Sequence, residues 1–81
     1  MNSLWKEKDN VITREFEFAD FAGALVFVNR VGELAQKADH HPDILLHSWN
    51  KVRITLSTHD KGGVTQKDYD LAEEIDGIEM Q

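Results

Sequence analysis

The spacing of apolar residues changes from strand-like to helix-like at Asp20, and this change constrains the fold more than any other feature of the chain. In residues 11–18 apolar and polar side chains largely alternate, which predicts a half-buried strand. Turn-forming residues precede it, so residues 4–8 are expected to form a short partner strand. From Asp20 to Ala38 apolar residues recur at helical spacing, which predicts an amphipathic helix capped by Asp20. This helix must end before Pro42.

The second half of the chain repeats the arrangement of strands followed by a helix. Residues 44–49 predict one strand, and residues 51–58 alternate more regularly and predict another, joined to the first by a short hairpin turn. Residues 59–64 are expected to form a loop that contains a pair of glycines. A second helix is expected to begin at Thr65, because Thr65 and Asp68 have the spacing of a capping box.

The predicted order of elements is therefore strand, strand, helix, strand, strand, helix. Two hairpins and two amphipathic helices fit an α+β fold, in which a four-stranded antiparallel sheet carries both helices on one face. A chain of 81 residues favours a single domain over residues 1–81.

The absence of cysteine limits what can stabilise so short a chain. A domain of this size buries only roughly 60–65% of the surface that its unfolded chain exposes, so its margin of stability is thin. Disulfide bonds and thiolate metal sites are excluded. A well-packed core, self-association or a metal ion held by histidines remain as sources of stability.

The charge balance argues against several classes of partner. Nine basic and fifteen acidic side chains give a formal net charge of −6, which repels phosphate backbones and makes direct nucleic-acid binding unexpected. No apolar run approaches the length of a membrane helix, and the first residues lack the apolar stretch of a signal peptide. We therefore expect no membrane association and a cytoplasmic location.

Three short clusters contain the side chains best suited to chemistry. In chain order they are His40-His41-Pro42, Trp49 and Thr58-His59-Asp60. Histidine exchanges protons near neutrality because its unperturbed pKa is about 6.5. Two adjacent histidines on an irregular segment cannot both point into a core, so at least one should face solvent or a pocket. A third histidine, at a strand end, could reach the edge of the same pocket. The pattern therefore predicts a pocket lined by histidines.

Several of these residues also have simpler structural explanations. A single histidine is more often structural, and we interpret the fourth, His47, in this way because it lies within a predicted strand. Asp68 would stabilise the free N–H groups at the start of the second helix. Trp49 could equally pack in the core, and Gly62-Gly63 lacks the longer pattern of a phosphate loop. Spacing alone supports the pocket and no particular reaction.

The ordered set of these motifs resembles the pterin-4a-carbinolamine dehydratase family. The family pattern is a His-His-Pro, then an aromatic residue, a further histidine and a later aspartate at fitting intervals. The resemblance extends over residues 12–76. It rests on Asp39-His40-His41-Pro42, Trp49-Asn50-Lys51-Val52, Ile54-Thr55-Leu56-Ser57-Thr58-His59, Gly63-Val64-Thr65 and Asp68.

The chain departs from the family pattern at two places. Family members usually carry a charged side chain shortly before the first histidine, at the position that is Gln36 here. Because Gln36 cannot ionise, the first histidine, His40, would titrate differently in this protein if the family's charged residue tunes it. Family members also commonly begin with an additional helix before the first strand, and we expect none here.

The resemblance implies elimination of water from a 4a-hydroxytetrahydropterin to give a quinonoid dihydropterin. One imidazolium would protonate the departing hydroxyl group, and a neutral imidazole would accept the proton from ring nitrogen N5. We assign His40 and His59 to these roles without deciding which is the acid, and His41 to catalysis and to holding the substrate. Further substrate contacts are expected from Trp49, Thr58, Asp60 and Asp68. Trp49 would form a wall beside the pterin ring, and Asp68 would also orient a histidine or fix the glycine loop. No metal and no cofactor are expected.

The same resemblance implies a homodimer or homotetramer, and two alternatives to the enzyme stay open. The fold could serve instead as a non-catalytic binding module or transcriptional cofactor with a protein partner. It could also hold a metal ion through the side chains of His40, His41, His59 and Asp68, although adjacent histidines rarely converge on one ion.

Overall fold

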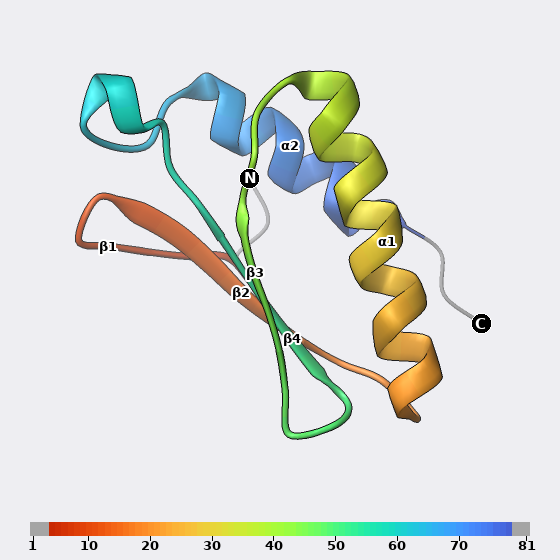
Figure 1. Cartoon of the computed structure of the whole chain (residues 1–81). Coiled ribbons are helices and arrows are strands. Elements are labelled where there is room, and N and C mark those ends of the chain that lie inside the picture. The colour runs from red at the N-terminus through yellow and green to blue at the C-terminus, as the bar shows by residue number, and fades with distance from the viewer. Residues whose placement is uncertain (1–3, 79–81) are drawn as a thin grey trace.

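The structure, a computed structural model, describes residues 4–78 and has the predicted α+β class. Its elements are β1 (Lys6–Lys8), β2 (Val11–Glu17), α1 (Phe21–Ala38), β3 (Asp43–His47), β4 (Lys51–Leu56), the short 3-10 helix η1 (His59–Lys61) and α2 (Gln66–Asp76). The order β-β-α-β-β-α is the predicted one, and no helix precedes β1 in the described residues. Figure 1 shows both helices on the same side of the sheet.

The four strands form one antiparallel sheet in the order β1-β2-β4-β3. Ile12 of β2 and its partner Leu56 point toward the helices and are fully buried, as are Val52 and Ile54 of β4. The strand predicted over residues 51–58 ends earlier, at Leu56. Beyond it Thr58 makes only an isolated bridge to Gly63, because the chain turns into η1.

Helix α1 begins and ends where local chemistry dictates. The Asp20 carboxylate accepts a hydrogen bond from the Gly23 N–H at 2.7 Å, which satisfies one of the free donors of the first turn. At the other end Asp39 adopts a left-handed conformation (φ 50°), and its N–H caps the last carbonyl groups. This reversal directs the following residues, His40 and His41, away from the helix axis toward the end of β4.

Both hairpin turns use left-handed residues other than glycine. Asp9 and Asn10 join β1 to β2, and Ser48 and Trp49 lie in the turn between β3 and β4, all with φ between 51° and 67°. Positive φ at these positions matches the right-handed twist of the paired strands. Asn50 follows the second turn, is buried, and donates its side-chain N–H to the Phe18 carbonyl at 2.9 Å.

The core centres on Phe27 of α1, which is 2% exposed. Its ring packs at 4.6 Å (centroid to centroid) from Phe16 and at 4.9 Å from Phe18. The buried Trp5 contacts the edge of Phe16 and so extends this aromatic cluster to the beginning of β1.

A polar network joins the N-terminal strands to the end of α2. The Trp5 indole N–H donates to the Asp76 carboxylate at 2.9 Å, and the Arg14 guanidinium pairs with the same carboxylate and lies over the Phe16 ring. A further hydrogen bond joins β1 to α2: the Tyr69 hydroxyl group donates to Glu7 at 2.7 Å, and this hydrogen bond and burial raise the pKa of Tyr69.

None of the helices in the described part of the chain has the length and apolar character that crossing a membrane requires.

Replacing Phe27 by alanine is expected to lower the free energy of unfolding by about 3–5 kcal/mol, because the substitution leaves a cavity beside the rings of Phe16 and Phe18. Urea unfolding followed by circular dichroism measures this loss. Val26→Ala is the matched control: Val26 is 45% exposed on the same helix, so its loss should stay within about 0.5 kcal/mol. Similar losses in the two variants would contradict the assignment of Phe27 to the centre of the core.

Candidate active site

Three segments that are far apart in the sequence meet at one end of the molecule: the exit of α1, the end of β4 with η1, and the start of α2 (Figure 1). They enclose an open cavity of ≈ 360 Å³. The residues that line it are Asp39, His40, His41, Ser57, Thr58, His59, Asp60 and Lys67. The structure thus brings together all three histidines that the sequence singles out, together with Thr58 and Asp60.

Asp68 is the anchor of this site, although it does not line the cavity. Its side chain is wholly buried and accepts three hydrogen bonds: from the Thr65 N–H at 2.8 Å, from the Thr58 hydroxyl group at 2.8 Å, and from His40 Nε2 at 2.5 Å. The first bond belongs to the predicted capping box of α2. A buried carboxylate is costly unless it is fully hydrogen-bonded, and no buried polar side-chain atom of the described residues lacks a partner.

His40 is held in one orientation by this carboxylate. Only 12% of its side chain is exposed, and its Nε2 faces Asp68. An ionised carboxylate can only accept a hydrogen bond, so neutral His40 carries its hydrogen on Nε2. The remaining ring nitrogen, Nδ1, is then the atom with which His40 can exchange a proton. A protonated His40 would form an ion pair with Asp68.

His41 and His59 are exposed at the rim of the cavity. His41 Nε2 lies 2.8 Å from the Gln36 side-chain oxygen on the last turn of α1. Gln36, expected from the sequence to lie beside the first histidine, His40, instead contacts the second, His41. His59 opens η1, and Gly62, whose φ of 73° suits glycine, ends this turn.

Three residues expected to contact a ligand are placed differently from that expectation: Trp49, Asp68 and Thr58. Trp49 lies in the turn between β3 and β4, 61% exposed, at the far end of β4 and more than about 20 Å along the strand from Thr58. The single chain therefore does not bring Trp49 to the cavity. Because Asp68 is buried, it can act on a ligand only through His40, and the Thr58 hydroxyl group is likewise committed to Asp68.

Sequence reasoning missed three residues that line the cavity: Asp39, Ser57 and Lys67. Lys67 precedes Asp68 in the first turn of α2, so once Asp68 is assigned to the site, the neighbouring position is a natural candidate. Asp39 and Ser57 flank histidine clusters but have no spacing signal of their own.

His47 lies away from the cavity, on the face of the sheet that the helices leave open. Its Nε2 is 2.9 Å from Glu15, which also pairs with Arg53 at 3.2 Å. Burial opposes the ionisation of Glu15, but the hydrogen bond from His47 and the charges of Arg53 and His47 lower its pKa overall. These contacts give His47 a structural role.

The geometry offers no ligand set for the metal-site alternative. Within residues 4–78, no three histidine, aspartate or glutamate side chains are placed to hold one metal ion. His40 is already committed to Asp68, and His41 to Gln36.

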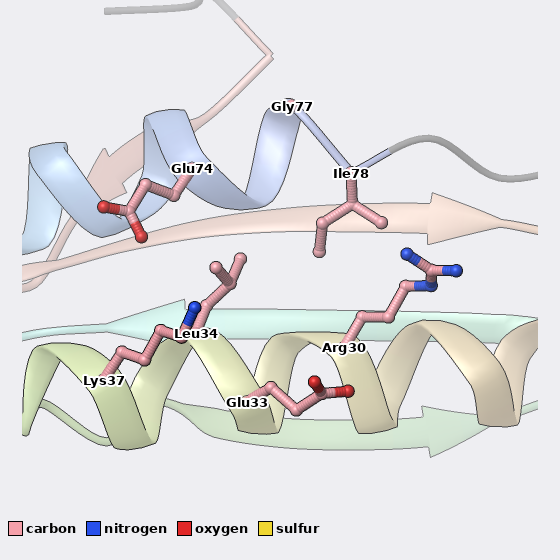
Figure 2. A pocket seen from close by; sticks show the side chains of 7 residues that line it. All are labelled: Arg30, Glu33, Leu34, Lys37, Glu74, Gly77 and Ile78. Carbon is pink, nitrogen blue, oxygen red and sulfur yellow. The ribbon is translucent and has the colours of Figure 1, made fainter.

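A second cavity, of ≈ 370 Å³, lies between α1 and the end of α2 (Figure 2). Figure 2 shows Leu34 and Ile78 pointing into the space between the helices, with Arg30, Lys37 and Glu74 around it. None of its lining residues is a histidine, so it lacks a group that exchanges protons readily near neutrality.

The fold and the first cavity define a small α+β protein with a histidine site suited to acid–base chemistry. The chain belongs to the pterin 4 alpha carbinolamine dehydratase family, whose family model matches residues 1–78. The resemblance found in the sequence is confirmed.

Individual relatives and solved structures agree with this assignment. A Picosynechococcus protein named "Putative pterin-4-alpha-carbinolamine dehydratase" is 54% identical over 91% of this chain and 79% of its own, and a Thermosynechococcus vestitus protein of the same name is 47% identical over 91% and 77%. The crystal structure of a transcriptional coactivator/pterin dehydratase from Brucella melitensis has a TM-score of 0.83 at 37% identity, over 91% of this chain and 80% of that one. A pterin dehydratase-like RuBisCO assembly factor of the alpha-carboxysome, with a TM-score of 0.71 at 20% identity, covers 89% of this chain and 82% of its own and shares the fold.

The Asp68→Asn variant is expected to lose about 2–4 kcal/mol of unfolding free energy at neutral pH, because an amide cannot accept all three hydrogen bonds of the buried carboxylate. Urea unfolding measures the loss. Asp70→Asn removes the same charge from an exposed position on the same helix and should change stability by less than about 0.5 kcal/mol. Equal losses in both variants would mean that the effect is only the removal of negative charge from α2.

Proposed function

We propose that the protein is a 4a-hydroxytetrahydrobiopterin dehydratase, which eliminates water from a 4a-hydroxytetrahydropterin to give the quinonoid dihydropterin. The observation that carries this proposal is the pairing of His40 with the buried Asp68 at the edge of a cavity that His59 also lines, in a chain of this family. The substrate class comes from the family, and the acid–base groups come from the site.

The elimination needs one proton donor and one proton acceptor. An imidazolium protonates the hydroxyl group on C4a as the C–O bond breaks, and a neutral imidazole takes the proton from N5 as the C4a=N5 double bond forms. No electron leaves the substrate, so the reaction balances without an oxidant or a reductant. We assign His40, acting through Nδ1, to one of these transfers and His59 to the other.

The two histidines suit these roles in different ways. Asp68 fixes the orientation of His40, as the aspartate does for histidine in a Ser-His-Asp triad. His59 is exposed and its side chain makes no hydrogen bond within residues 4–78, so it can adjust to the bound ring and exchange protons with solvent between turnovers. His41 and Asp60 would contact the polar edge of the pterin, and Thr58 would act through Asp68.

A second proposal is a binding role on the same scaffold. The Brucella melitensis relative is described as a transcriptional coactivator as well as a pterin dehydratase, and the carboxysome neighbour as an assembly factor. Such a role would depend on a binding surface and not on the histidines. A binding protein would therefore keep its role when the histidines are replaced, whereas an enzyme would lose its activity.

Self-association into a homodimer or homotetramer is part of the proposal. The outer edge of β3 has no partner strand in the described sheet. Phe21 and Leu25, which are 49% and 43% exposed, lie on the flank of α1 opposite Leu34, and Leu34 faces α2. A free edge and an apolar helix flank support contact with a second copy. Because β3 also contacts α1, the two features belong to one side of the molecule.

The dehydratase is tested by generating 4a-hydroxytetrahydropterin with a pterin-dependent hydroxylase and following dihydropterin formation. The protein should accelerate this step, and His59→Ala and His40→Gln should each lower the rate by about 10²–10⁴-fold. Glutamine at position 40 can still donate to Asp68, so the variant should fold. His47→Ala is the control and should retain the rate. No acceleration by the folded protein would overturn the enzymatic proposal and favour the binding role.

Assembly is tested by sedimentation at several concentrations. The protein should sediment as a dimer or tetramer, and Phe21→Asp with Leu25→Asp should shift it toward the monomer, because charge cannot be buried in an apolar contact. Val26→Asp introduces a charge on another flank of α1 and should leave the assembly intact. A protein that sediments as a monomer at all concentrations would contradict the proposed surface.

A further inference from the structure

The two adjacent histidines of the site have hydrogen-bond partners of different charge. His40 meets the carboxylate of Asp68, whereas His41 meets the neutral side-chain amide of Gln36. The Gln36 atom in contact, 2.8 Å from His41 Nε2, is the carbonyl oxygen, which only accepts hydrogen bonds. The proton of this bond therefore belongs to His41, on Nε2.

This arrangement determines what His41 can offer to a ligand. With its hydrogen on Nε2, the neutral ring presents Nδ1 as an acceptor, and a carboxamide gives no charge that would favour the imidazolium. His41 lines the cavity, so Nδ1 is the ring nitrogen left to accept a hydrogen bond there.

We propose that Gln36 is a positioning residue that holds His41 as the neutral Nε2–H tautomer, so that Nδ1 accepts a hydrogen bond from an N–H group of the substrate. This inference rests on the proposed function, because the N–H donor is that of a pterin ring. The two adjacent histidines then have different roles: His40 exchanges a proton with the substrate, and His41 binds the substrate through a hydrogen bond.

The charges around His41 make the identity of residue 36 important. The other titratable or charged groups of the cavity are Asp39 at the end of α1, His40, His59 and Asp60 of η1, and Lys67 of α2. Two carboxylates already face this space against one lysine. A third carboxylate, at position 36, would add to the negative charge and favour protonation of His41, which would convert Nδ1 from an acceptor to a donor.

The test compares Gln36→Glu and Gln36→Leu with the unchanged protein by NMR of the histidine ring nitrogens. His41 should show the Nε2–H tautomer in the unchanged protein and a mixture of tautomers in Gln36→Leu. In Gln36→Glu, the midpoint of its titration should rise by roughly 0.2–0.7 of a pH unit, as expected for an exposed ion pair. Asn29→Asp, the same change from amide to acid at an exposed position about 10 Å along the helix, should leave His41 unchanged.

The kinetic expectation is specific to binding. Both Gln36 variants should raise KM for the pterin by roughly 2–10-fold, the effect of one hydrogen bond, with kcat changed less than KM. In Gln36→Glu the increase in KM should shrink as the pH is raised, because His41 then loses its additional proton.

Two results overturn the inference. One is an Nδ1–H tautomer of His41 in the unchanged protein, and the other is a tautomer and titration that neither Gln36 variant alters. If NMR gives the expected result but the unchanged protein does not accelerate dehydration, the proposed function fails, whereas the positioning of His41 by Gln36 stands. The two failures are therefore distinguishable.

Discussion

The buried carboxylate of Asp68 is the interaction on which the rest of the structure depends. It joins the start of α2, the end of β4 and the segment that leaves α1, through Thr65, Thr58 and His40 respectively. A wholly buried carboxylate is costly unless it is hydrogen-bonded, and these three hydrogen bonds together offset that cost. The same atoms that begin a helix therefore also orient a histidine, and the folding of this end of the domain and the assembly of the site are one event.

This dependence gives the site a rigid side and an adaptable side. His40 has its ring orientation fixed by a wholly buried partner. His41 and His59 lie at the exposed rim, one held by a surface glutamine and the other on a single 3-10 turn. The proposed dehydration, which requires two proton transfers to one bound ring, would benefit from this division, because the fixed group would set the position and the exposed groups would adjust to it.

The sequence predicts the elements well because their signals are local. Asp20 at its helix N-cap, and Thr65 with Asp68 as a capping box, act over a few residues, and each lies where its spacing indicates. The bond between His40 and Asp68 spans 28 positions and depends on how α2 crosses the end of β4, which no periodicity encodes. The same limit applies to Trp49, whose interval from His59 matches the family pattern. Strand β4 lies between these two residues, so the interval shows only that they lie at opposite ends of the strand.

The length of α1 separates the site from the proposed contact with a second copy. Phe21 and Leu25 lie in its first turns and His40 follows its last, so its 18 residues place about 27 Å between the two ends. Substitutions at one end leave the packing at the other largely untouched, since distant sites contribute almost independently to stability. A scaffold of this kind can keep its assembly surface while its histidines change, or the reverse. This independence gives a physical reason why one fold is found both in a protein described as a pterin dehydratase and in one described as an assembly factor.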